Sequence, residues 1–198
     1  MLKSFRNTLC YLSYLIKRKS IHGIHSPFVF DFAKDVLHDK KHYQAYKSIL
    51  KARKAMLTNN NLIETVDFGT GSGNKDFHTY RIKIAELSKK RMHPYKYNKL
   101  LFRIVQYFKP KTILEFGTST GASTISLALG NATSKVVSIE GCASISYFAQ
   151  STFDRMQLSN IELVIGNFNN VLPSTLSAID QLDLVYIDGN HRKLPTLN

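Results

Sequence analysis

The hydrophobic pattern of the chain changes character near residue 111. Before that point the apolar positions mostly recur at intervals of three and four, as Leu9, Leu12 and Ile16 do, which predicts amphipathic helices. After it, short continuous apolar runs alternate with stretches of helical periodicity. Apolar strands separated by helices are typical of a parallel sheet covered on both faces. The pattern therefore predicts a helical leader over residues 1–110 and an α/β core over residues 111–198.

The same periodicities place the individual elements. In the leader they predict helices over 2–18, 27–37, 42–57, 77–90 and 95–108, and a short strand over 62–68. Ser26 and Pro27 suit the N-cap and the first position of a helix. In the core they predict strands over 112–116, 136–139, 161–165 and 182–187, and helices over 123–129, 143–156 and 170–178.

One glycine-containing phrase occurs twice, as Asp-Phe-Gly-Thr-Gly-Ser-Gly at residues 67–73 and as Glu-Phe-Gly-Thr-Ser-Thr-Gly at residues 115–121. A glycine turn between a strand and a helix favours nucleotide binding, because the main chain and the helix N-terminus can approach the ligand. Such a βαβ unit also needs an acidic residue at the end of the next strand, about 20 positions further on. Glu140 meets this condition for the second phrase only. We therefore expect residues 67–73 to form a structural loop that borders the site.

The second phrase, Glu140 and residues 182–191 (Leu-Asp-Leu-Val-Tyr-Ile-Asp-Gly-Asn-His) together resemble class I S-adenosylmethionine-dependent methyltransferases. The Asp-Gly-x-His ending is similar to that of the small-molecule O-methyltransferases in this family. The resemblance implies a Rossmann-like parallel sheet whose strands lie in the order 3-2-1-4. It also implies S-adenosylmethionine as the cofactor and a small-molecule hydroxyl as the methyl acceptor.

By this resemblance the cofactor-binding residues are Glu115, Gly117, Thr118, Ser119, Gly121, Glu140, Asn167 and Asp188. The two glycines would let the main chain approach the methionine part of the cofactor, with Thr118 and Ser119 as hydrogen-bond donors. Glu115 would bind the ammonium group, directly or through water, and Glu140 the ribose hydroxyls. For both carboxylates the alternative is a solvated strand end. Asn167 would face the adenine, and its alternative is simple turn chemistry.

Asp188 and His191 are the predicted catalytic residues. The carboxyl ends of parallel strands border the ligand crevice, so both side chains should face the transferred methyl group. His191 either acts as a general base or caps the following helix. In catechol-type members of the family, the residue that matches Asp188 binds a divalent cation together with a later Asp-Asn pair. The sequence ends at Asn198 before such a pair, so a divalent metal has no support and no metal ligand is predicted. The histidines at positions 22, 25 and 93 are left without a role.

The net charge of +13 comes from the predicted leader. Residues 1–60 carry 12 Lys or Arg and three Asp or Glu, and residues 61–110 carry 10 and four. A basic surface of this kind can attract nucleic acid, which makes an RNA-directed methyltransferase the alternative function. The other interpretation is a solvated, lysine-rich helical surface.

Several further features limit the class of protein. Two cysteines without metal-ligand spacing fit the cytoplasm, and no apolar stretch reaches the length of a membrane helix. The resemblance implies strands beyond the fourth, so we expect a C-terminal truncation relative to the family and an exposed apolar edge at 182–187. A cofactor-binding module without turnover is therefore a third candidate function. The oligomeric state is not predicted.

Overall fold

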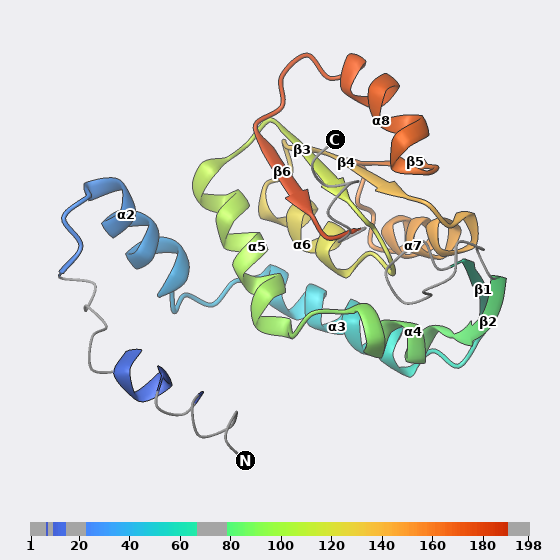
Figure 1. Cartoon of the computed structure of the whole chain (residues 1–198), viewed down its shortest axis with the longest axis horizontal. Coiled ribbons are helices and arrows are strands. Elements are labelled where there is room, and N and C mark those ends of the chain that lie inside the picture. Colours follow the sequence, from blue (N-terminus) through green and yellow to red (C-terminus); the bar gives the residue numbers. More distant parts are fainter. Residues whose placement is uncertain (1–6, 8–9, 15–22, 67–78, 190–198) are drawn as a thin grey trace. The chain divides into compact units, whose positions relative to one another are not determined.

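The computed structural model describes residue 7 and residues 10–14, 23–66 and 79–189 (Figure 1). The chain forms two compact units, Met1–Lys41 and His42–Asn198. In the first unit, α2 (Pro27–Phe32) continues into a π-helical turn, η2 (Ala33–Leu37). The Ser26 side chain caps α2 by accepting a hydrogen bond from the Val29 N–H, which confirms the predicted helix start. Of the helix predicted over 2–18, only residues 7 and 10–14 are described, and they are helical.

The second unit is built on a parallel sheet in the order β5-β4-β3-β6. Its strands are β3 (Thr112–Phe116), β4 (Lys135–Glu140), β5 (Ile161–Ile165) and β6 (Leu184–Ile187). This confirms the predicted Rossmann-like α/β fold with strand order 3-2-1-4. The register places Glu115 opposite Ser138 on β4 and Tyr186 on β6, so the carboxyl ends of the three strands meet around it.

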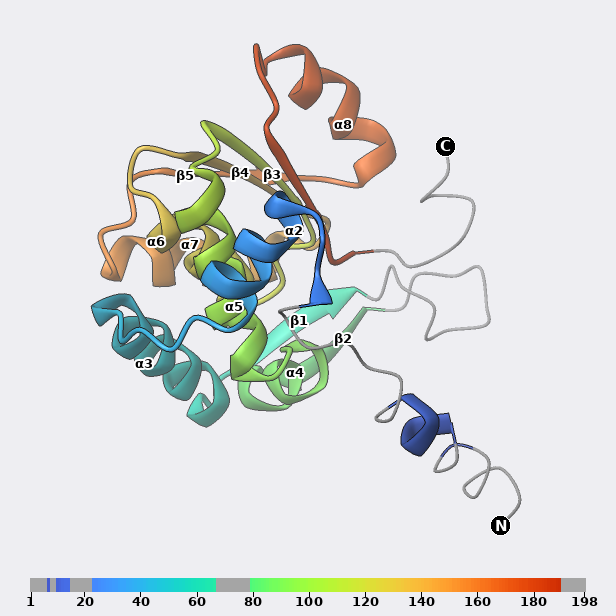
Figure 2. The same cartoon turned by 90° about the vertical axis from the view of Figure 1, so that its left-hand side faces the viewer.

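Helices cover both faces of this sheet because alternate strand residues point to opposite sides. On one face, α5 (Tyr95–Phe108) and α6 (Ala122–Gly130) pack on Ile113 and Val136, and α7 (Ala143–Arg155) contacts β4 and β5. On the other face, α8 (Phe168–Ser177) packs on Leu114 and Val137. Figure 2 shows the strands between α8 and the helices α6 and α7.

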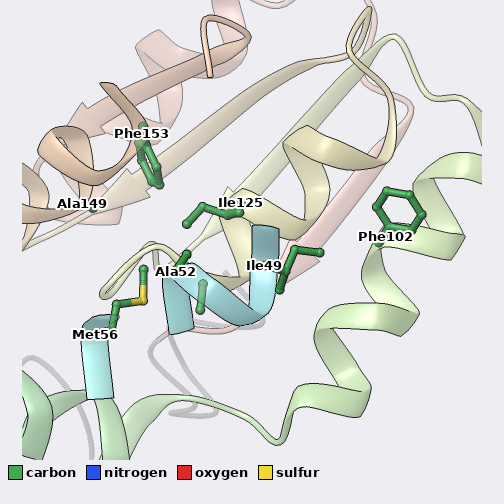
Figure 3. Packing of buried hydrophobic residues seen from close by; sticks show 8 residues of the cluster. Ile49, Ala52, Met56, Phe102, Ile125, Ala149 and Phe153 are labelled. Carbon is green, nitrogen blue, oxygen red and sulfur yellow. The ribbon is translucent and has the colours of Figure 1, made fainter. Parts of the chain in front are cut away.

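Helices α3 (Gln44–Thr58) and α5 complete the core beside α6, although the sequence assigns both to the leader. Figure 3 shows Ile49 and Met56 of α3 in one apolar cluster with Phe102, Ile125 and Phe153. Burial of these side chains contributes about 1.5–3 kcal/mol each to the stability of the unit. This packing holds α5 and α6 against each other and thus fixes the elements on either side of the glycine-containing residues 117–121.

The helix predicted over 77–90 is wrong in its first part. Thr79–Lys83 forms β2, which pairs antiparallel with β1 (Leu62–Val66), and α4 (Ile84–Arg91) begins only after it. Ile82 lies opposite Ile63, and both are buried. This cross-strand pair outweighs the helical periodicity of the segment, since strand preference depends on what packs on the strand.

The glycine phrase at residues 67–73 lies outside the described residues. The strands on either side of it pair antiparallel, so the next described element after it is a strand. A nucleotide-binding loop needs a helix at that point. The second phrase, at residues 115–121, has this arrangement, because β3 leads into it and a helix, Ala122–Gly130, follows it.

Strand β6 is at the edge of the described sheet, next to β3 alone. Val185 and Ile187 are 45% and 54% exposed, so the edge carries apolar side chains as expected. Within the described ranges, no helix combines the length and the apolar character that crossing a membrane demands.

Candidate functional site

The site is centred on the loop that joins β3 to α6, residues 117–121 (the β3–α6 loop). Three of its residues have left-handed backbone: Gly117 with φ 95°, Ser119 with φ 48° and Gly121 with φ 90°. A side chain at Gly117 would lie 3.0 Å from the Asp188 carbonyl oxygen. Both glycines are therefore required by conformation, because other residues reach such φ values only at a cost in energy. The loop turns tightly across the ends of β4 and β6.

Glu140 at the end of β4 holds this loop in place. Its side chain is buried, which removes the alternative of a solvated strand end. Oε2 accepts a hydrogen bond of 2.8 Å from the Ser119 N–H, and Oε1 accepts one of 3.0 Å from the Cys142 N–H. A carboxylate has about four acceptor positions, so Glu140 can still accept hydrogen bonds from two hydroxyl groups of a ligand.

Glu115 lies under the same loop and is fully buried. Oε2 accepts hydrogen bonds of 2.5 Å from Thr124 Oγ1 and 2.6 Å from Ser138 Oγ. Oε1 has no hydrogen-bond partner among the described residues, and neither has the buried Oγ of Ser119. Burial raises the pKa of Glu115 to about 7, although the hydroxyl groups of Ser123, Ser138 and Thr124 around the carboxyl group oppose this shift. The carboxyl group can therefore hold or release a proton near neutral pH.

Asp188 follows β6 and lies next to Gly117 of the loop. Oδ1 is 3.0 Å from Nε2 of His93, and Oδ2 accepts a hydrogen bond of 3.3 Å from the Tyr186 hydroxyl. Burial, followed by the charges of Asp188 and Glu115, raises the pKa of Tyr186 well above its ordinary value. The phenol therefore remains a hydrogen-bond donor, and two donors fix the orientation of the Asp188 carboxylate.

A pocket opens between the β3–α6 loop and the connection from α4 to α5. The loop contributes Ser119 to its wall, the connection contributes His93, and α5 contributes Tyr97. Tyr186 and Asp188 complete the wall from the end of β6. A carboxylate, a phenol and an imidazole thus line the same space.

His93 has no role in the predictions from the sequence. It precedes Asp188 by 95 residues, and the packing of α5 against α6 brings the two together. The single local signal was a histidine next to Pro94, just before a helix whose start is otherwise uncapped. Such a position suits an ordinary loop histidine equally well.

Three predicted site residues are placed differently or are not described. Asn167 caps α8, because its side chain accepts a hydrogen bond of 3.0 Å from the Asn169 N–H. This is the turn chemistry that the sequence left open, and an adenine contact stays a prediction. His191 lies outside the described residues. Thr118 is buried, with Oγ1 at 2.5 Å from Ser138 Oγ. Its hydroxyl therefore hydrogen-bonds the loop to β4.

Among the described side chains, no group of three or more His, Cys, Asp or Glu residues has the arrangement of a metal site.

Comparisons with known proteins show what the core is similar to. Residues 114–198 match a family model described as a methyltransferase domain. No curated protein matches the chain. Among solved structures, the O-methyltransferase TomG from Streptomyces achromogenes, in complex with S-adenosylmethionine, is similar with a TM-score of 0.52 and 20% identity, over 83% of this chain and 63% of that one. A methyltransferase from Podospora anserina, bound to S-adenosylhomocysteine, is similar with a TM-score of 0.51 and 16% identity, over 87% of this chain and 62% of that one.

The family match confirms the resemblance to methyltransferases for the part of the chain from residue 114 on. The structural similarities confirm the Rossmann-like fold of such enzymes. The chain spans 63% and 62% of the length of these two solved structures.

Proposed function

We propose that the chain binds S-adenosylmethionine at the β3–α6 loop and transfers its methyl group to a hydroxyl oxygen of a small molecule. The observation that carries this proposal is the pair of buried oxygens without described partners, Glu115 Oε1 and Ser119 Oγ, beside a loop of left-handed residues. Buried polar atoms are nearly always hydrogen-bonded in folded proteins. Two of them at one loop indicate that a polar ligand supplies the missing hydrogen bonds.

The residues present fit the cofactor. Glu115 offers an unpaired carboxylate oxygen for an ammonium group, directly or through water. Glu140 offers free acceptor positions for the two ribose hydroxyls, while its contact with the Ser119 N–H keeps the loop in shape. When bound, the cofactor would supply an electrophilic methyl group on a positively charged sulfur. The chain would then bind and orient both reactants, which is a large part of the catalysis of such a displacement.

A small-molecule hydroxyl as acceptor is supported by two observations. TomG is named as an O-methyltransferase of tomaymycin synthesis, and transfer to oxygen requires removal of a proton. The pocket next to the loop contains groups that accept protons, His93 and Asp188.

The free thiols of Cys10 and Cys142 support a cytoplasmic location.

Isothermal titration with S-adenosylmethionine and S-adenosylhomocysteine tests the binding step. We expect both to give saturable heat with the wild-type chain. We expect Glu140→Gln to weaken binding about 10- to 100-fold, because hydrogen bonds to a charged group contribute about 1.5–3 kcal/mol. Glu162→Gln is the matched control, since its side chain on β5 is exposed and pairs with Lys135. An absence of heat with folded wild-type protein would reject the proposal.

The acceptor class is tested by transfer of a labelled methyl group. We expect label in phenols such as catechol and not in total RNA. Label in RNA, together with RNA binding that weakens steeply with salt, would instead favour the RNA-directed alternative that the basic leader suggests.

A further inference from the structure

We propose that His93 is the catalytic base of this reaction: it accepts the proton of the acceptor hydroxyl while Asp188 holds its ring in place. The inference rests on the proposed methyl transfer and assigns its proton-transfer step. It gives a role to a histidine that belongs to neither glycine phrase and lies on the connection between α4 and α5.

The His93 ring is positioned from two sides. Nε2 is 3.0 Å from Asp188 Oδ1, and the ring packs edge-on against Tyr97 with 5.9 Å between the ring centroids. The side chain is 52% exposed, so a ligand in the pocket can reach it. A ring that is held in orientation and still accessible meets the geometric requirement for a general base.

The partner of Nε2 determines which nitrogen is basic. A carboxylate only accepts hydrogen bonds, so Nε2 must carry the hydrogen and donate this hydrogen bond to Asp188. This leaves Nδ1 with its lone pair, and no described residue donates a hydrogen bond to it. In catalytic triads the same arrangement of an aspartate and a histidine sets the tautomer and stabilises the imidazolium that forms.

The other titratable groups around the ring leave this role to His93. The Tyr186 hydroxyl donates a hydrogen bond to Asp188, and burial keeps it protonated. Arg91 and Tyr97 also line the pocket, and a guanidinium has no acceptor. Glu115 is fully buried and contacts Thr124 and Ser138 instead. Of the described pocket residues, His93 combines a free lone pair with access to the pocket.

The reaction balances without a further reactant. The acceptor oxygen forms a bond to the methyl carbon, the carbon–sulfur bond breaks, and its electron pair stays on sulfur. The acceptor proton moves to Nδ1 of His93. Asp188 then faces a positively charged imidazolium, and the ion pair replaces the charge lost from sulfur.

The tautomer is the first test and does not depend on turnover. NMR spectra of the chain labelled with ¹⁵N-histidine, in the presence of S-adenosylhomocysteine, should show His93 protonated on Nε2 and unprotonated on Nδ1. We expect Asp188→Asn to remove this preference. The opposite tautomer in the wild-type chain would overturn the inference even when the ligand binds. Failure of S-adenosylhomocysteine to bind at all would instead reject the proposed function.

Kinetics give the second test, with His93→Gln as the variant. Glutamine keeps a hydrogen-bond donor for Asp188 but has no basic nitrogen, so methylation of catechol should slow at least about 100-fold. Binding of S-adenosylhomocysteine should stay within about threefold, a shift well below 1 kcal/mol. For 4-nitrocatechol, whose hydroxyl is far more acidic, the loss should be much smaller.

His42→Gln is the matched control, because His42 is exposed at the start of the second unit. Equal losses for both phenols would show a structural role for His93 and overturn its role as a base. Wild-type rates in the His93→Gln variant would do the same. If neither phenol is methylated, the His93 tautomer measured by NMR decides whether the inference stands.

Discussion

Replacing Gly121 by alanine should lower the free energy of unfolding by about 4 kcal/mol. Gly121 has φ 90° and is the residue before α6, a backbone conformation that costs alanine about 1–3 kcal/mol. Its new Cβ would lie 2.6 Å from Cε1 of Phe153, which is fully buried. Overpacking of this kind costs about 1–3 kcal/mol more. Urea denaturation followed by circular dichroism measures the change.

The two contributions can be separated with Phe153→Leu. In the double variant the collision is relieved and the backbone strain remains, so part of the loss should return as a coupling energy. The Phe153→Leu chain alone supplies the reference for this cycle. A Gly121→Ala chain within about 1 kcal/mol of the wild type would show that residue 121 does not need the left-handed backbone, contrary to the cost expected of it.

Gly121 is one of several local features that made this part of the core predictable from the sequence. The elements from β3 to β4 depend on local rules: an apolar strand, a glycine with positive φ, a helix and a strand that ends in Glu140. Each rule acts over a few residues, and all of them agree here. The strand order followed from the family resemblance, and the structure confirms it.

Contacts between distant segments could not be predicted in this way. Strand β2 exists because Ile82 pairs with Ile63 on β1, and periodicity within residues 77–90 carries no information about that partner. The hydrogen bond from His93 to Asp188 spans 95 residues and arises from the packing of α5 against α6. The burial of Glu115 is a third case, since strand-end carboxylates are usually solvated. The described residues that carry chemistry were thus identified by motif where the motif is local, and missed where it is not.

Glu115→Gln should change stability in a manner that depends on pH. The pKa of Glu115 is about 7 in the folded chain, above its ordinary value of 4.5. Between these two values the folded state keeps a proton that the unfolded state releases, so wild-type stability falls as the pH rises. Above about pH 7 both states are ionised and the loss is complete, on the order of 3 kcal/mol.

Glutamine removes this penalty and keeps the acceptor that Thr124 and Ser138 use. The variant should therefore match the wild type near pH 4.5 and be more stable by on the order of 3 kcal/mol at pH 8. Urea titrations across this range measure the difference, and Glu162→Gln, with its exposed side chain on β5, is the control variant. A difference that stays constant, or that grows towards acid pH, would contradict the assignment.

A carboxylate that lowers the stability of its own protein calls for a function that offsets the loss. The unpaired Oε1 of Glu115 identifies where that function acts, next to the β3–α6 loop. We therefore expect Glu115→Gln to gain stability at pH 8 and to bind S-adenosylhomocysteine about 10-fold more weakly, since one charged hydrogen bond is lost. Thermal unfolding with and without the ligand measures both effects in one series. Greater stability with unchanged affinity would confine Glu115 to a structural role.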